Sequence, residues 1–193
     1  MIDSTKISNT NEILFLTSNK HKVSEAQTIL NKFNLKVVSM SAKGVEIQTD
    51  SLSDVARVCA NNAYAKIKKP LFVEDSGLFV DALGGFPGVY SSYVLDKVGC
   101  EGILRLLDQQ RRRSAHFACA VAYVDETGTH LFEGKVFGRI SDQISLGGGF
   151  GYDPIFIPDG HNEPFSKLMD VKSEISHRVI AIGQLGQFLA IRK

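Results

Sequence analysis

The chain has few cysteines, no long apolar run and almost no net charge, and each shortage excludes a class of protein. Its three cysteines show no close pairing such as Cys-x-x-Cys, so neither a disulfide framework nor a zinc site is expected. No stretch approaches the roughly 20 apolar residues that span a bilayer. A net charge of +1 over 193 residues gives no general attraction to nucleic acid or to a membrane surface. We therefore expect a cytoplasmic protein without nucleic-acid or membrane partners.

The rest of the composition is that of a globular domain, with 44% hydrophobic and 22% charged residues. Residues 1–12 are polar and lack the apolar core of a signal peptide, so we expect a loosely held leader there. No internal repeat or low-complexity linker divides the remainder. Residues 13–193 are therefore predicted to form one domain.

Apolar spacing predicts strands that alternate with helices, then a long hairpin, then a final helix. The predicted strands are residues 13–16, 35–40, 70–73, 116–123, a partner strand ending near 140, and 155–157. The predicted helices are residues 20–33, 51–67, 90–98, 102–109 and 176–190. This order predicts an α/β protein with a mixed sheet.

Two adjacent carboxylates, Glu74 and Asp75, follow the apolar run 70–73 at the point where that strand is expected to end. Burying two charges there is costly unless a positive group lies beside them. A Mg²⁺ ion, which binds through one or two carboxylates together with substrate phosphates, is the simplest such partner. Use of Asp75-Ser76-Gly77 as a turn or helix cap is an equally good explanation of these residues alone.

Residues 17–22 join the first strand to the first helix, and such a junction can bind an anion through backbone N–H groups and the helix dipole. It is not a Walker loop, because the glycines and the Gly-Lys-Ser/Thr ending are absent. Taken alone, an ordinary helix cap by Ser18 or Asn19 is the better explanation. Glu46, in an irregular stretch, could be a surface acid or a further carboxylate for a metal.

Two later segments could bind a flat ligand. Glycines at 147–149 and 151 flank Phe150 and could present its ring to a ligand, although the aromatics could equally fill the core. Around the start of the last helix, Lys172, His177 and Arg178 offer donors for a carbonyl oxygen or a phosphate. A capped helix with a surface arginine is the competing interpretation.

These motifs, in this order, resemble the inosine triphosphate pyrophosphatase family, enzymes that hydrolyse non-standard purine nucleoside triphosphates. The matching segments, which run through nearly the whole chain from Ile13 on, are residues 17–22, 74–77, 83–91, 149–156 and 172–178. Ser18 stands where the family usually has glycine. If that position needed a positive φ, serine would cost about 1 kcal/mol.

The resemblance implies an elongated, two-lobed α/β domain around a long mixed β-sheet, with a central substrate cleft. It implies hydrolysis of ITP, dITP or XTP to the monophosphate and pyrophosphate, with one or more Mg²⁺ ions, by a homodimer. Asp75 would be the catalytic base and a metal ligand, Glu74 a supporting acid, and Glu46 a second metal ligand. The residues implied to contact the nucleotide are Thr17, Ser18, Asn19, Lys20, His21, Lys22, Ser76, Phe150, Gly151, Tyr152, Asp153, Lys172, His177 and Arg178.

Two alternatives stay open. The related Maf-like pyrophosphatases share the chemistry but act on pyrimidine nucleotides, and the elements around Phe150 and Arg178 argue against them. A nucleotide-binding protein without turnover would lack a catalytic acid, whereas Glu46, Glu74 and Asp75 are all present.

Overall fold

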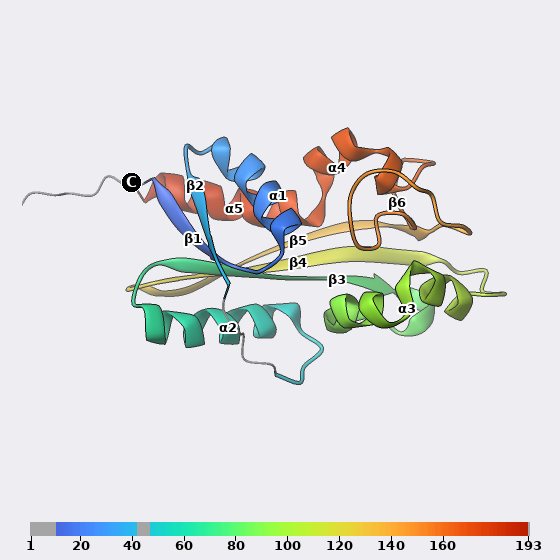
Figure 1. The fold of residues 1–193 in the computed structure, drawn as a ribbon, viewed down its shortest axis with the longest axis horizontal. Helices are drawn as coiled ribbons and strands as arrows, with labels where there is room; N and C mark the ends of the chain where they lie inside the picture. The colour runs from blue at the N-terminus through green and yellow to red at the C-terminus, as the bar shows by residue number, and fades with distance from the viewer. Residues whose placement is uncertain (1–10, 42–46, 193) are drawn as a thin grey trace, which may run out of the picture.

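The computed structural model describes residues 11–41 and 47–192, and its centre is a mixed sheet with helices on both faces (Figure 1). The strands are β1 (Glu12–Leu16), β2 (Lys36–Met40), β3 (Leu71–Val80), β4 (Ser114–Asp125), β5 (Gly128–Ile140) and β6 (Phe156–Pro158). The helices are α1 (Lys20–Asn31), α2 (Leu52–Ile67), α3 (Ser91–Leu106), α4 (Met169–Ile175) and α5 (His177–Ile191). Short 3₁₀ turns lie at Asp81–Leu83, Gly88–Tyr90 and Phe165–Lys167.

The sheet has the order β2-β1-β3-β4-β5-β6, in which β1 runs parallel to β2 and β3 and the later neighbours are antiparallel. Figure 1 shows α1, α4 and α5 on one face and α2 and α3 on the other. Apolar side chains pack in one cluster under α1 and α5, in a second under α2, and in a third around α3 and β6. The first two clusters form one lobe and the third forms the other. The predicted fold, an α/β domain with two lobes around a long mixed sheet, is therefore confirmed.

The strand that carries the acidic pair does not end where the sequence suggested. β3 continues through Glu74 and Asp75 to Val80, because β4 pairs with it along its whole length. On its other edge, β1 pairs only with residues 71–73 and then leaves the sheet after Leu16. From Glu74 to Leu78 no strand in the described part of the chain pairs with that edge of β3, and Phe79 then forms an isolated bridge with Pro87. The chain leaving β1 lies beside this unpaired stretch.

Two glycines permit close backbone contacts near this region. A Cβ atom on Gly77 would lie 2.2 Å from the carbonyl oxygen of Gly88, and one on Gly134 would lie 2.1 Å from the carbonyl oxygen of His177. Only glycine fits at such distances. Gly77 lets the 83–90 turn segment pack on β3, and Gly134 lets the start of α5 pack on β5.

The helices differ from prediction in one respect that affects the site. The last helix was expected over residues 176–190 and α5 matches it, but the chain before it forms a further helix, α4, that was not predicted, and it breaks at Ser176, whose ψ of 155° is extended. The Ser176 hydroxyl then caps α5 by accepting the N–H of Val179. Lys172 and Arg178 consequently lie on two different helices. The predicted pair of short helices is α3, which is broken at Gly99 with φ of 66°.

Within the described ranges, no helix is long and apolar enough to cross a membrane. Residues 1–10 of the predicted leader lie outside those ranges, and of its last two residues, Asn11 and Glu12, the second begins β1.

Candidate active site

A cleft of about 340 Å³ crosses the open edge of β3 between the two lobes. It is lined by side chains from the β1–α1 loop, β3, the start of α3, the glycine-rich loop and the helices α4 and α5. These residues are Thr17, Ser18, Asn19, Lys22, Asp75, Ser76, Gly77, Leu78, Val89, Ser91, Ser92, Leu95, Phe117, Phe150, Gly151, Tyr152, Asp153, Lys172, His177 and Arg178.

The β1–α1 loop forms one end of this cleft and is closed by its own hydrogen bonds. The Asn19 side chain accepts the N–H groups of His21 and Lys22, and the Thr17 hydroxyl accepts the N–H of Asn19. Asn19 is therefore the helix cap, and it already uses two of the donors that an anion could bind. The helix dipole and the Lys22 ammonium remain to attract phosphate at this end.

The two adjacent carboxylates have different surroundings because successive side chains of a strand point to opposite faces. Glu74 points toward α1 and α5, where its side chain is fully buried and Arg178 donates to both of its oxygens at 3.1 Å. Lys22 lies 3.4 Å from the same carboxylate. Burial opposes ionisation of Glu74, but the charges of Arg178 and Lys22 outweigh it and lower its pKa. Glu74 is therefore the counter-ion of Arg178.

Asp75 points to the other face and lines the cleft. Burial raises the pKa of Asp75 from 3.8 to about 6, against the charge of Lys22, and the nearby charge of Glu74 raises it further. A carboxyl whose pKa lies near neutrality and that faces a cleft has the properties of a general base or a cation ligand.

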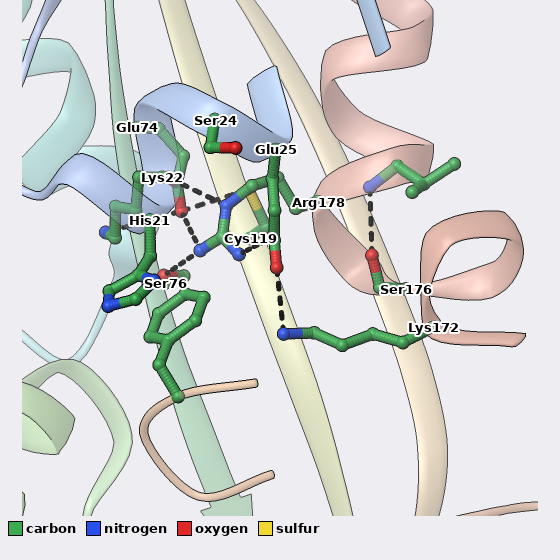
Figure 2. A network of polar contacts seen from close by, with 12 residues as sticks. His21, Lys22, Ser24, Glu25, Glu74, Ser76, Cys119, Lys172, Ser176 and Arg178 are labelled. Atoms are coloured by element: carbon green, nitrogen blue, oxygen red, sulfur yellow. Dashed lines mark hydrogen bonds and ion pairs between the residues drawn. The ribbon is translucent and has the colours of Figure 1, made fainter. Parts of the chain in front are cut away.

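Arg178 is the centre of a buried ionic network (Figure 2). Besides Glu74, it donates to the Ser76 hydroxyl at 3.1 Å and to Glu25 at 2.6 Å. A guanidinium has five N–H groups, and these contacts with described residues use four of them. One N–H, on Nη1, remains for a ligand.

Lys172 is equally enclosed. Its ammonium lies 2.6 Å from Asp153 and 2.8 Å from Glu25, and its side chain is 3% exposed. The same ammonium lies 4.5 Å from the centroid of the Phe150 ring, and the Arg178 guanidinium lies 5.6 Å from it. The His21 ring stacks on Phe150 with centroids 5.0 Å apart. The Phe150 ring is thus in contact with aromatic and cationic groups where a base was expected to stack.

His177 closes the inner wall of the cleft. Its ring stacks on Phe117 with centroids 4.8 Å apart, and burial together with the charge of Arg178 lowers its pKa well below the ordinary value, so the ring is neutral. Its Nδ1 atom is buried and has no hydrogen-bond partner among the described residues. An unpaired buried ring nitrogen beside the cleft is a natural contact for a polar ligand edge.

Most of the predicted contact residues meet in this one cleft, and three of the described predicted site residues do not line it. Lys20, His21 and Glu74 are not among its lining residues, and Glu46 lies outside the described residues. Ser18 lines the cleft but is absent from the described non-glycine residues with positive φ, so the strain considered for it does not arise.

Sequence reasoning missed one residue of the network, Glu25. It lies one turn after Lys22 on α1 and in register with the buried Ala26 and Ile29, so it is a charge within an apolar stripe. This position could have identified Glu25 from the sequence, because a charge on a buried helix face requires a partner of opposite charge.

The cleft fits a divalent cation. Asp75 supplies a carboxylate oxygen of the kind that Mg²⁺ prefers, and Mg²⁺ completes its shell with water and substrate phosphates. Residues 11–41 and 47–192 contain no group of three or more histidine, cysteine, aspartate or glutamate side chains placed to hold a metal. Asp75 would thus act as one protein ligand, with the substrate supplying others.

A strand–loop–helix junction, a carboxyl of raised pKa and an aromatic ring thus line one cleft of an α/β sheet, an arrangement suited to a hydrolase of nucleotides. The chain belongs to the Ham1 family, whose sequence model matches residues 13–188. It is 44% identical over 182 residues to the dITP/XTP pyrophosphatase of Ignicoccus hospitalis, covering 93% of this chain and 97% of that protein. It is 42% identical to the dITP/XTP pyrophosphatase of Thermococcus kodakarensis, covering 92% and 96% of the two chains.

Solved structures agree. The Ham1 protein of Staphylococcus aureus superposes with a TM-score of 0.81 at 28% identity, covering 94% of this chain and all of that one. A Ham1 protein from Coxiella burnetii gives a TM-score of 0.82 at 28% identity, covering 93% and 98%. The family predicted from the motifs is confirmed.

Proposed function

We propose that this protein hydrolyses non-standard purine nucleoside triphosphates (ITP, dITP and XTP) to the nucleoside monophosphate and pyrophosphate, with Mg²⁺. One observation carries the proposal: a single cleft joins an anion site at Lys22, the carboxyl of Asp75 and a base pocket at Phe150. Relatives named dITP/XTP pyrophosphatase, matched over nearly their full length, support the same substrates.

In this mechanism the triphosphate lies along the β1–α1 loop, with Lys22 and the α1 dipole offsetting its charge. Asp75, ionised above about pH 6, accepts a proton from the attacking water or orients it. Bound Mg²⁺ would neutralise charge that develops on the phosphates. Lys22 is the cation shared between the phosphates and Glu74.

Base selection follows from the remaining donors of the pocket. Arg178 and Lys172 each keep one N–H beyond those used by the described carboxylates and hydroxyl. A 6-oxo purine accepts such donors, whereas adenine presents an amino group to them. Leaving a buried donor unpaired costs about 1–3 kcal/mol, which is about a tenfold to hundredfold preference.

The alternatives lose support on these observations. The pyrimidine-specific reading lacks a matching relative among those described, and the purine-type elements at Phe150 and Arg178 meet in the cleft. A protein that binds nucleotides without turnover does not need a carboxyl in the cleft whose pKa is raised toward neutrality, as that of Asp75 is.

The test is a turnover panel of ITP, XTP, dITP, GTP, ATP and UTP, with and without Mg²⁺, assayed separately for pyrophosphate and orthophosphate. We expect pyrophosphate from the first three, dependent on Mg²⁺ and abolished in a folded Asp75→Asn variant. Orthophosphate as the sole product, or faster turnover of UTP, would contradict the proposal.

We further propose a cytoplasmic homodimer. Cys100 and Cys119 are buried free thiols, which suits a reducing compartment, and Phe86, Tyr90 and Tyr93 expose aromatic surface where an interface could form. Light scattering after size exclusion should give twice the chain mass, and a Tyr93→Glu variant should shift it toward the monomer.

A further inference from the structure

The hydroxyl of Ser91, at the start of α3, is hydrogen-bonded to β3. It accepts the backbone N–H of Leu78 at 2.8 Å and donates to the carbonyl oxygen of Gly88 at 2.7 Å. No described strand lies beside β3 at Leu78, on the side away from β4. The buried Ser91 hydroxyl therefore takes the place of a strand partner for this N–H.

The same edge of β3 holds the carboxylate of Asp75. Alternate residues of a strand direct their backbone N–H groups to the same edge, so the N–H groups of Ser76 and Leu78 are neighbours there. The Ser76 N–H is hydrogen-bonded to the Asp75 carboxylate. Ser91 thus anchors the backbone two positions after the N–H that orients the proposed general base.

The carbonyl group of Ser91 is bound to the glycine-rich loop. The Tyr152 hydroxyl donates to it at 3.0 Å, and the Tyr152 ring packs in the apolar cluster around α3. The loop is a tight turn at this point, because the Asp153 carboxylate accepts the N–H of Phe150 at 2.8 Å. A shift of Tyr152 would therefore move the Phe150 ring as well.

We propose that Ser91 is a positioning residue that sets the separation of Asp75 and Phe150: its hydroxyl holds β3, and its carbonyl holds the glycine-rich loop through Tyr152. A nucleoside triphosphate that spans the cleft needs both ends at the correct separation, because its phosphate must meet the attacking water while its base stacks on Phe150. A ligand that occupies one end has no such requirement. This inference rests on the proposed function, because it assumes that the substrate spans the cleft.

The experiment compares wild type with Tyr152→Phe and with Ser91→Ala, using kcat for ITP and the inhibition constants of inosine and pyrophosphate, which each occupy one end. We expect either variant to lower kcat about tenfold and to leave both inhibition constants within about twofold. A merely structural defect in the loop would weaken inosine, and one in β3 would weaken pyrophosphate. Either weakening, or an unchanged kcat in the variants, overturns the inference.

The double variant tests whether the two hydrogen bonds form one link. Breaking either bond already severs the link, so the double variant should lower kcat no further than the more affected single variant does. Losses that multiply would show two unrelated defects and overturn the inference. If one single variant does not fold, the other decides through kcat and the two inhibition constants.

Tyr64→Phe is the matched control. It removes a tyrosine hydroxyl from α2, outside the residues that line the cleft, and should change neither kcat nor the inhibition constants. An active wild type with an unchanged kcat in both cleft variants overturns this inference alone. A wild type that releases no pyrophosphate from ITP overturns the proposed function and the inference with it.

Discussion

Replacing Asp75 by asparagine should abolish turnover and yet make the ligand-free protein more stable at neutral pH. Burial raises the pKa of Asp75, so the folded protein holds a proton there more tightly than the unfolded chain does. Ionising this carboxyl at neutral pH therefore costs folding free energy. Asparagine has nearly the same shape, can accept the Ser76 N–H as the carboxyl does, and carries no charge.

The size and sign of the effect follow from the pKa. The difference between 3.8 and about 6, at about 1.4 kcal/mol for each pH unit, makes ionised Asp75 unfavourable by about 3 kcal/mol above pH 6. For a chain of this length, that corresponds to a rise in melting temperature of about 6–10 °C in the variant. The gain should shrink to about 1 kcal/mol near pH 4.5, where the folded protein keeps Asp75 protonated.

The assay is thermal unfolding in the presence of a chelator at about pH 7.5 and pH 4.5, because a bound cation would stabilise the ionised wild type. Asp96→Asn, which removes an exposed carboxyl, is the matched control and should leave the melting temperature almost unchanged. A variant no more stable than wild type at pH 7.5, or a gain equal at both pH values, would refute the reasoning.

Three further predictions concern the same cleft. Glu74→Gln leaves the buried charge of Arg178 with less compensation and should destabilise the protein by about 3–5 kcal/mol in urea unfolding, opposite in sign to the Asp75 variant; unchanged stability would contradict the role of counter-ion. The His21 ring stacks on Phe150, where the base is proposed to stack, so the base has to displace it. His21→Ala removes this pair, which is worth about 0.5–1.5 kcal/mol, and should therefore lower KM for ITP about threefold at constant kcat. A higher KM would instead make His21 a wall of the base site. The acid limb of kcat/KM should lie near the pKa of Asp75, about 6, at low Mg²⁺ and move to lower pH as Mg²⁺ is raised, because cation and proton compete for one carboxylate; a limb independent of Mg²⁺ would argue against Asp75 as a ligand.

Features with a local cause could be predicted from the sequence. The helix cap at Asn19, the hairpin at residues 125–128 and the alternation that makes β4 a buried strand all appear as expected. The resemblance carried by the ordered motifs also predicted that residues far apart in the sequence would share one cleft, and residues from these motifs do line a single cleft.

Features that depend on neighbouring strands and helices could not be predicted. Whether β3 stops at Glu74 or continues is decided by β4, some 45 residues further along the chain, which supplies its hydrogen-bond partners. The opposite roles of Glu74 and Asp75 follow from strand alternation only once that continuation is known. The ion pairs of Glu25 join residues about 150 positions apart, and no local pattern specifies them.

In the proposed mechanism, the ionic network would also determine the orientation in which a nucleotide binds. Among the described residues, three cations line the cleft, namely Lys22, Lys172 and Arg178, and unpaired they would attract a triphosphate to any part of it. Glu25, Glu74 and Asp153 offset the charge of Lys172 and Arg178 at the base end, which leaves hydrogen-bond donors there but little net attraction for phosphate. Lys22 is the most loosely paired of the three, at 3.4 Å from Glu74, and it lies at the helix terminus whose dipole adds to its charge. In the proposed mechanism, charge would therefore draw the phosphates to the β1–α1 loop, and the directional donors at the other end would select a neutral base.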